Sequence, residues 1–305
     1  MNNHIFVSEE AQGERIDHFL TSALPQLSRN RIQQLIRDGH VTLGGNALKK
    51  SYLVQAGDEF LIQLVEELPP ELLEQNIPLD IIYQDDDLAI INKPRGMVVH
   101  PAPGHEKGTL VNALLYHLDN LSQMDATRPG IVHRMDRDTT GLLVVSKNES
   151  THRYFLDLFK RHDLDRVYWA LVHGRVKVDE LTIDAPLGRD SKNRKTFIVD
   201  PEGRRAITHV KVLETFKDYS LVECRLETGR THQIRVHLKS INHPVVGDSV
   251  YGPKKSPWKN HGQFLHAKQL AFMHPDGRRL SFDSNLPPDF ESQLKRLRRM
   301  SQIPE

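Results

Sequence analysis

The chain has 305 residues, of which 38% are hydrophobic and 27% are charged, and it contains one cysteine. This length suffices for two domains with separate cores. A single cysteine excludes a disulfide framework. The sequence shows neither an apolar leader after its polar N-terminus nor a run of about 20 apolar residues. We therefore expect a soluble, cytoplasmic protein that does not enter a membrane.

The net charge of +1 conceals an uneven distribution of charge along the chain. Residues 51–92 contain ten acidic side chains and no lysine or arginine, so the regions on either side are strongly basic. Basic surface favours a phosphate backbone, because binding releases counterions. An equal alternative is that these basic residues form solvated faces without a ligand.

The N-terminal region has a compact pattern of short helices and strands. Apolar spacing predicts a helix from Ile16 to Leu24. A second helix is predicted between Ser28, a favourable N-cap residue, and Gly39, which suits the position after a helix C-terminus. Arg29 and Arg37 lie on its polar face, and we expect their guanidinium groups to face solvent. Short strands are predicted at residues 41–43 and 60–62.

This pattern resembles the small α/β RNA-binding domain first seen in ribosomal protein S-four. The residues that carry the resemblance are Arg15, Asp17, Ser28, Arg29, Ile36, Arg37, Asp38, Gly39, His40, Val41, Gly57 and Asp58. The resemblance implies an RNA-binding domain over residues 1–65, in which Arg29 and Arg37 face structured RNA. A basic helix without a ligand is the alternative.

A change in composition separates this region from a larger one. Residues 66–76 are acidic, contain Pro69-Pro70 and lack the periodicity of a helix or strand, so we expect a linker with some stiffness. The second domain is predicted to span residues 77–305. Its strands and helices do not alternate regularly, which favours an α+β fold with a central mixed, mostly antiparallel β-sheet flanked by helices and loops.

The larger region opens with a predicted hairpin, in which residues 79–83 and 88–92 form strands joined by Asp85-Asp86-Asp87. Three consecutive acids could suggest a divalent metal. Because consecutive side chains point apart and no further acid cluster follows, we expect a polar turn and predict no metal site. Further elements are predicted at residues 151–162 and from Thr231 onwards, both helices, and at 168–172, 207–213 and 221–226, all strands.

The segment His133–Gly141 is a polar loop between apolar runs at residues 131–132 and 142–145, both predicted as strands. Catalytic groups are commonly displayed on such connections. The loop places Asp136 beside two arginines, and nearby positive charge favours the ionised form of a carboxyl group. Asp136 is therefore better suited to act as a nucleophile or base than as a proton donor.

Ordered sequence blocks in the larger region occur at residues 92–101, 133–141, 166–168, 228–237, 243–252 and 265–267. Together they resemble the RluA-type family of RNA pseudouridine synthases, and the joined N-terminal domain matches its ribosomal members. The Arg-x-Tyr block and the Asp-Thr-Thr-Gly sequence are most similar to the RluD branch. That branch modifies the stem-loop known as helix 69 of large-subunit rRNA.

The resemblance implies that uracil leaves its sugar at nitrogen, turns, and rejoins the sugar through carbon. Asp136 corresponds to the catalytic acid residue, and the sequence leaves open whether it attacks the sugar C1′, attacks uracil C6 or abstracts the 2′ proton. Arg235 corresponds to the arginine that pairs with this acid, and Tyr168 to the tyrosine that stacks on the target base. Arg134 corresponds to the residue that fills the space vacated when the base flips out.

The other site predictions concern loop structure and the RNA backbone. His133 is expected to orient the loop, and Asp138 to cap the turn that follows. Arg230 is expected either to bind phosphate or to stabilise its own turn. Lys192 and Arg194 lie in a basic stretch predicted to contact phosphates. No cofactor is expected, because the isomerisation oxidises nothing and loses no group.

The expected partner is 23S rRNA or a precursor of the large ribosomal subunit. We expect the protein to be a monomer that binds neither a membrane nor a small-molecule cofactor. Three alternatives stay open. One is an RluC-like synthase that acts on other 23S uridines, and a second is a non-catalytic rRNA-binding assembly factor. The third is a metal-dependent nuclease that uses His and Asp side chains.

Overall fold

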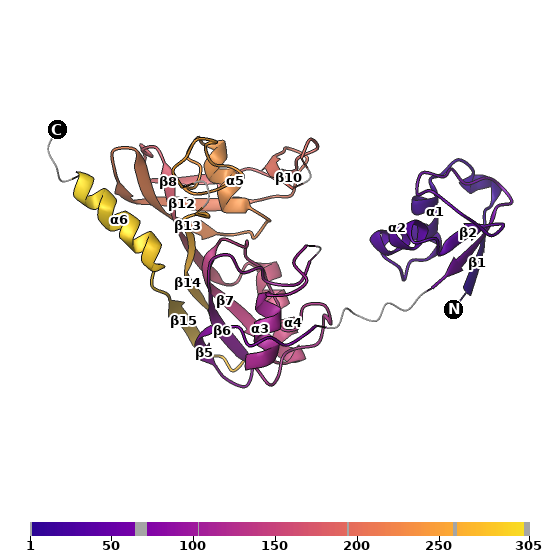
Figure 1. Ribbon diagram of the computed structural model, residues 1–305, viewed down its shortest axis with the longest axis horizontal. Helices are drawn as coiled ribbons and strands as arrows, with labels where there is room; N and C mark the ends of the chain where they lie inside the picture. The colour runs from indigo at the N-terminus through magenta and orange to yellow at the C-terminus, as the bar shows by residue number, and fades with distance from the viewer. Residues whose placement is uncertain (1, 65–71, 103, 194, 259–260, 302–305) are drawn as a thin grey trace. The chain divides into compact units, whose positions relative to one another are not determined.

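The computed structural model of the chain describes residues 2–64, 72–102, 104–193, 195–258 and 261–301 (Figure 1). The chain forms two compact units, Met1–Pro70 and Glu71–Glu305. Within the predicted linker, residues 66–71 lie outside the described residues. Gln75, near its end, donates its backbone N–H to the Asn112 carbonyl at 2.9 Å, so this part of the predicted linker is attached to the larger unit.

The smaller unit packs two helices on an antiparallel sheet. Its elements are β1 (Asn2–Phe6), a 3₁₀ turn (Glu9–Ala11), α1 (Ile16–Ala23), α2 (Arg29–Arg37), β2 (Val41–Leu43), β3 (Asn46–Ala47) and β4 (Glu59–Gln63), with the sheet order β1-β4-β2-β3. As predicted, Ser28 caps α2 by accepting a hydrogen bond from the Arg31 N–H, and Gly39 follows the helix with a φ of 77°. The strand β1 was not predicted from the sequence.

Arg29 and Arg37 on the predicted basic face of α2 are both exposed, and Arg29 also binds a buried carboxylate. Asp17 on α1 is fully buried and accepts hydrogen bonds from Arg29 at 2.9 Å, Gln33 at 2.7 Å and Arg15 at 3.0 Å. Burial raises the pKa of Asp17, but these donors outweigh it and hold the pKa well below its ordinary value. Arg29 therefore joins the two helices while its side chain stays 46% exposed.

Exchanging the charge of Arg29 should destabilise the smaller unit. Arg29→Glu removes a donor to Asp17 and places a like charge beside it, which we expect to cost about 1–3 kcal/mol. Hydrogen exchange of the full chain should then speed up across residues 16–37. Arg37→Glu on the same helix is the matched control and should leave this exchange within the range of a surface substitution. Equal exchange in both variants would contradict the role given to Asp17.

The larger unit is built on a nine-stranded sheet with the order β5-β6-β7-β14-β8-β13-β12-β9, and β15 pairs with β14 (Figure 1). Its strands are β5 (Asp80–Gln84), β6 (Leu88–Lys93), β7 (Thr140–Ser146), β8 (Asp165–His173), β9 (Glu180–Asp184), β12 (Ile207–Thr215), β13 (Tyr219–Leu226), β14 (Leu265–Met273) and β15 (Arg279–Asp283). Strands β10 (Leu187–Arg189) and β11 (Phe197–Val199) form a separate pair, and the helices are α3 (Leu110–His117), α4 (Glu149–Arg161), α5 (Gln233–Ser240) and α6 (Pro288–Ser301). In the described sheet, β7 and β14 are parallel and the other pairings are antiparallel, so the predicted α+β class is confirmed.

The strand predicted at residues 131–132 is wrong. Ile131 forms an isolated bridge with Val145 and is not part of a strand. The apolar residues Ile131 and Val132 instead pack the loop against β7. The helix predicted from Thr231 begins two residues later, because His232 takes a left-handed conformation with a φ of 58°. In the described part of the chain, no helix combines the length and the apolar character that crossing a membrane requires.

Gly141 fixes where the loop 133–141 enters the sheet. Its φ is 105°, and a Cβ at this position would lie 2.3 Å from the backbone oxygen of Ala267. Only glycine tolerates both this conformation and this contact with β14. The parallel pairing of β7 with β14 therefore depends on the last residue of the predicted loop motif.

Candidate active site

A cavity of about 410 Å³ opens beside the loop 133–141. It is enclosed by that loop, α4, the start of β8, the turn after β13, the start of α5 and one residue of β14. Its wall includes Arg134, Asp136, Lys160, Arg166, Tyr168, Arg230, His232 and Arg235. Five of its lining residues are Lys or Arg and one is acidic, so the cavity is strongly basic around a single carboxylate.

That carboxylate, Asp136, is paired with Arg235 as predicted. The Arg235 Nη1 donates to Asp136 Oδ2 at 2.8 Å, from a side chain that is 5% exposed. Asp136 is 21% exposed and reaches the cavity. Residues 99 positions apart in the sequence therefore meet because α5 and the loop border the same cavity.

A second carboxylate, Asp248, holds the other edge of Arg235. Asp248 is buried and accepts from Arg235 Nε at 2.6 Å and from Nη2 at 2.9 Å, while Val250 and Tyr251 donate their backbone N–H groups to it. Burial lowers the pKa of Arg235, but its bond to Asp248 and the charge of Asp136 outweigh burial and raise it overall. The arginine is thus fixed on one side and presents Nη1 to Asp136 on the other.

The sequence did not assign a role to Asp248, although Gly247-Asp248 belongs to one of the ordered blocks. The sequence shows Asp248 only as an acid in a Gly-Asp turn close to a tyrosine. That pattern fits an exposed turn as well as a buried carboxylate that binds an arginine. The ring of that tyrosine, Tyr251, lies 5.0 Å from the Arg235 guanidinium carbon, and its hydroxyl is 2.8 Å from His232 Nδ1. His232 Nε2 in turn lies 3.8 Å from Asp136, which adds a second side chain near the carboxylate.

Tyr168 lies on β8 and forms part of the apolar wall of the cavity. It is 8% exposed and packs in the main hydrophobic core of the larger unit. Burial raises its pKa, and the charge of Asp136 acts in the same direction, against that of Arg166. The phenol therefore stays protonated at neutral pH, and its ring can support a base while its hydroxyl donates.

The side chains of His133 and Lys93 hold the loop in place. His133 Nε2 accepts the backbone N–H of Val144 at 3.0 Å, which agrees with the predicted orienting role of His133. Lys93 is fully buried at the end of β6, and its Nζ donates to the carbonyl oxygens of Pro94, Met97 and Arg137 at 2.9, 3.0 and 3.0 Å. The sequence contained Lys93 in an ordered block but gave no indication that it would be buried.

Asp138 does not cap the following turn, which corrects the prediction. The turn is closed by the Thr139 N–H, which donates to the Asp136 carbonyl at 3.1 Å. The Asp138 carboxylate instead accepts from Arg137 at 3.3 Å. Asp136 therefore occupies the first position of the turn, where its side chain is free to point into the cavity.

The residues predicted to bind RNA lie in different environments. Arg134 is exposed at the cavity and, among the described residues, has neither a hydrogen bond nor an ion pair. Arg230 is also exposed at the cavity, and its Nε donates to the Arg205 carbonyl at 3.1 Å, which joins the turn after β13 to the segment before β12. Lys192 is exposed in the connection from β10 to β11, and Arg194 lies outside the described residues.

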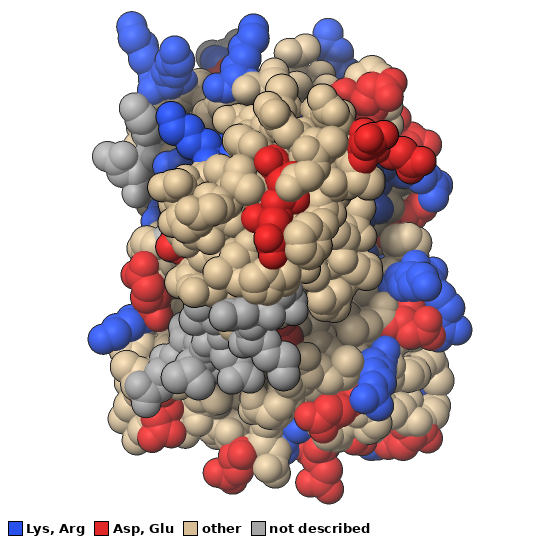
Figure 2. All heavy atoms as spheres, turned by 90° about the vertical axis from the view of Figure 1, so that its right-hand side faces the viewer, with Lys and Arg blue, Asp and Glu red and all other residues tan. Residues whose placement is uncertain are grey.

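Basic and acidic side chains are interspersed on the face drawn in Figure 2, so charge of one sign does not cover that face. The cavity, with five Lys or Arg side chains and one acid, is more one-sided in charge than this surface. The local concentration of positive charge therefore marks the cavity more clearly than the net charge of the chain does.

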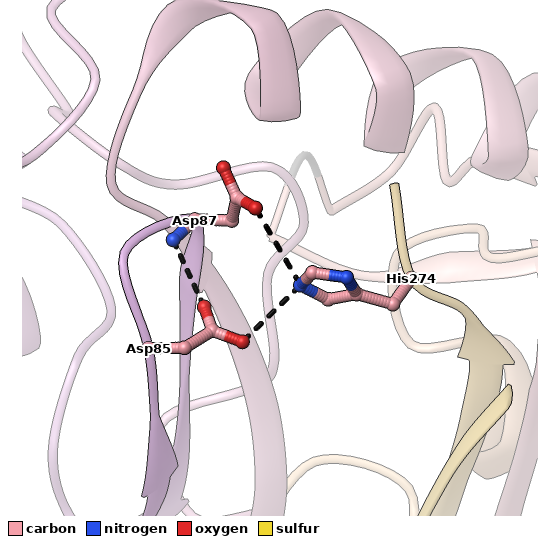
Figure 3. Close-up of side chains that lie close together, drawn as sticks. All are labelled: Asp85, Asp87 and His274. Atoms are coloured by element: carbon pink, nitrogen blue, oxygen red, sulfur yellow. Dashed lines mark hydrogen bonds and ion pairs between the residues drawn. The ribbon is translucent and has the colours of Figure 1, made fainter. Parts of the chain in front are cut away.

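The acidic turn at Asp85–Asp87 forms as predicted, but His274 joins it. His274 Nε2 lies 3.2 Å from Asp85 and 3.7 Å from Asp87, and the three side chains are close enough to hold a metal ion (Figure 3). Protein donors already bind both carboxylates: Tyr83 and two backbone N–H groups bind Asp85, and Asn148 and Thr151 bind Asp87. The group links the β5–β6 turn to the β14–β15 turn, at the opposite end of β6 from Lys93.

Comparison with known proteins connects this cavity to a family. Residues 87–240 match the RNA pseudouridylate synthase family, and residues 14–60 match the S4 domain. The chain is 48% identical, over 97% of its length and 98% of the relative's, to the uncharacterized RNA pseudouridine synthase YlyB of Bacillus subtilis. This chain belongs to the RNA pseudouridylate synthase family. The predicted enzyme class and the predicted S-four-like domain are both confirmed.

Other pseudouridine synthases extend the comparison. The chain is 42% identical to the ribosomal large subunit pseudouridine synthase D of Zymomonas mobilis, with 96% of each chain covered. The solved structure of human RNA pseudouridylate synthase domain containing 1 superposes with a TM-score of 0.58 at 24% identity, over 75% of this chain and 96% of that one. This structural likeness shows that the synthase fold is shared.

Replacing Lys93 should loosen the loop of this pseudouridine synthase. Lys93→Met leaves three carbonyl oxygens without their donor, one of them in a buried bond, which we expect to cost about 1–3 kcal/mol. Burial lowers the pKa of Lys93 to about 7, against the charges of Asp138 and Asp136. The folded pKa lies below the unfolded value of about 10.4, so the unfolded chain binds more protons between these two values.

The stability of the wild type should therefore rise relative to that of Lys93→Met between about pH 7 and pH 10. Thermal unfolding of both proteins across this range measures the difference. A constant difference in melting temperature over the whole range would contradict the lowered pKa of Lys93.

Proposed function

We propose that this pseudouridine synthase isomerises specific uridines of 23S ribosomal RNA, in the helix 69 stem-loop. The observation that carries the proposal is the carboxylate of Asp136, held by Arg235 at 2.8 Å in a basic cavity lined by Tyr168. The name of the Zymomonas mobilis relative, ribosomal large subunit pseudouridine synthase D, supports the class of RNA. The assignment to helix 69 rests on the sequence blocks that are most similar to the RluD branch.

The reaction needs the target uridine outside its helix, because a stacked base does not expose its glycosidic bond. Flipping a base costs a few kcal/mol, which contacts made by the flipped state must offset. We propose that Arg134 fills the vacated space, since it is exposed at the cavity with no partner among the described residues. Tyr168 then stacks on the flipped uracil, with its apolar ring in the cavity wall.

In this mechanism Asp136 begins the isomerisation. It bonds to the sugar C1′, bonds to uracil C6, or takes the 2′ proton, and each route requires a carboxylate whose direction is fixed. Arg235 fixes that direction through a charge-assisted hydrogen bond. The bond from N1 to C1′ breaks, the base turns, and a bond from C5 to C1′ forms. C5 then loses its proton and N1 gains one. The product has the atoms of the substrate, so the proposal includes no cofactor.

The two units have separate roles in this proposal. Residues 1–65 bind structured rRNA, residues 66–76 connect the units, and residues 77–305 carry the catalytic cavity. The exposed side chains of Arg29, Arg37, Arg230 and Lys192, together with Arg194, would contact phosphates. The protein would act as a monomer in the cytoplasm, on the rRNA or on a precursor of the large subunit.

Asp136→Asn tests the catalytic role. The amide is nearly isosteric but cannot serve as nucleophile or base, so we expect loss of at least about 1,000-fold in rate, within the range of catalytic-residue effects. The measurement is carbodiimide-dependent reverse-transcription stops on a helix 69 transcript, with RNA binding measured in parallel. Undiminished stops with Asp136→Asn would remove Asp136 from the chemistry.

Mapping pseudouridines in the 23S rRNA of a deletion strain tests the target. Loss of pseudouridine in helix 69 is the expected result. Loss at other 23S positions would instead indicate an RluC-like target, and an unchanged pseudouridine map would favour an assembly factor.

A further inference from the structure

The cavity contains a second buried arginine, Arg166, which lies two residues before Tyr168 on β8. It is 8% exposed, and its Nε is buried without a hydrogen-bond partner. Among the described residues, no carboxylate forms an ion pair with it. Nothing in the reaction described above uses this side chain.

The two buried arginines of the cavity differ in whether a carboxylate neutralises their charge. Arg235 is bound by two carboxylates, Asp136 and Asp248. Arg166 instead lies 5.4 Å from the ring of Phe159 and near His133, whose pKa burial lowers to about 3, so that its imidazole is neutral. A buried charge is costly unless it is paired, and an arginine stays protonated in proteins. Arg166 is therefore a cation without an anion.

The guanidinium of Arg166 can reach a ligand in the cavity. Both Arg166 and Gly229 line the cavity, and Gly229 is exposed. A Cβ at Gly229 would lie 2.6 Å from Arg166 Nη1, so the absence of a side chain at this position makes room for the guanidinium. Nε is the nitrogen sealed inside the protein, and the Nη atoms lie toward the turn that borders the opening.

The substrate supplies the missing charge. Uracil and ribose are neutral, and the anionic group of RNA is the phosphodiester. Arginine binds phosphate well because its fork of N–H donors matches two phosphate oxygens. Residues two apart on a strand point to the same face, so Arg166 and Tyr168 address the same side of a bound nucleotide.

We propose that Arg166 binds a phosphate flanking the flipped uridine, which makes it a positioning residue in a backbone subsite of the cavity. The proposal rests on the proposed function, since it takes the flipped uridine as the occupant. Holding the phosphate next to the base that Tyr168 contacts fixes the sugar between them. This places C1′ and the 2′ position at a constant distance from Asp136.

Neutral phosphate analogues test this contact. Two stem-loop substrates carry a methylphosphonate on the 5′ or the 3′ side of the target uridine, and both are compared with the all-phosphate RNA. Wild type should lose about 10- to 100-fold in kcat/KM for one of the two substituted RNAs, the range for a hydrogen bond to a charged group. Arg166→Met should lose a similar factor with the all-phosphate RNA and change less than about threefold on substitution.

Arg175→Met is the matched control, because Arg175 is an exposed arginine just beyond the other end of β8, roughly 25 Å away along the strand. It should respond to methylphosphonate as the wild type does. Arg166→Lys keeps the charge and should retain part of the sensitivity, which answers the question if the methionine variant does not fold. Melting temperatures accompany the rates, and removing an uncompensated cation should not lower that of Arg166→Met.

The proposal would be overturned if the Arg166→Met substitution and the methylphosphonate acted independently on the rate. If the losses from Arg166→Met and from methylphosphonate multiply at both positions, Arg166 does not bind either phosphate. A lowered melting temperature with multiplying losses would assign Arg166 to the fold alone. Failure of the proposed function looks different, because wild type would then form no pseudouridine on the all-phosphate stem-loop.

Discussion

The structure of the cavity depends on a buried arginine held between two carboxylates. Arg235 gives two of its nitrogens to Asp248 and one to Asp136. Removing charged groups from water is costly, and excellent geometry is needed to offset it. Asp248 offsets this cost, because it is buried, binds Arg235 through two hydrogen bonds and accepts two backbone N–H groups. Arg235 can then act on the partly exposed Asp136 as a fixed donor.

The rest of the fold places the loop that carries Asp136 against this arginine. Gly141 allows the loop to enter the sheet where β7 meets β14, and Lys93 ties the loop to the end of β6 through carbonyl groups. His133 adds a bond to β7. The positions of these contacts explain why the loop motif includes glycine and histidine as well as the acid. Rigid placement matters because small displacements of a catalytic group cost large factors in rate.

Much of the site could be predicted from the sequence, and the misses have physical causes. The pairing of Asp136 with Arg235 followed from a family resemblance, because two residues 99 positions apart share no local pattern. Asp248 and Lys93 were not assigned, since their burial depends on tertiary packing that no local pattern encodes. Arg29 is exposed as predicted, but its bond to Asp17 was not predicted because Asp17 lies on another helix. The apolar run at residues 131–132 is only two residues long, which is too short to distinguish a strand from a loop that packs against the sheet.

Because Asp248 holds Arg235 and Arg235 holds Asp136, we expect Asp248 and Arg235 to affect the reaction as one unit. A double-mutant cycle of single-turnover rates with Asp248→Asn, Arg235→Lys and the combined variant tests it most directly. If one interaction connects them, the combined variant should be no slower than the slower single variant to within about threefold, and RNA binding should change little. Rate losses that multiply in the combined variant would contradict the account.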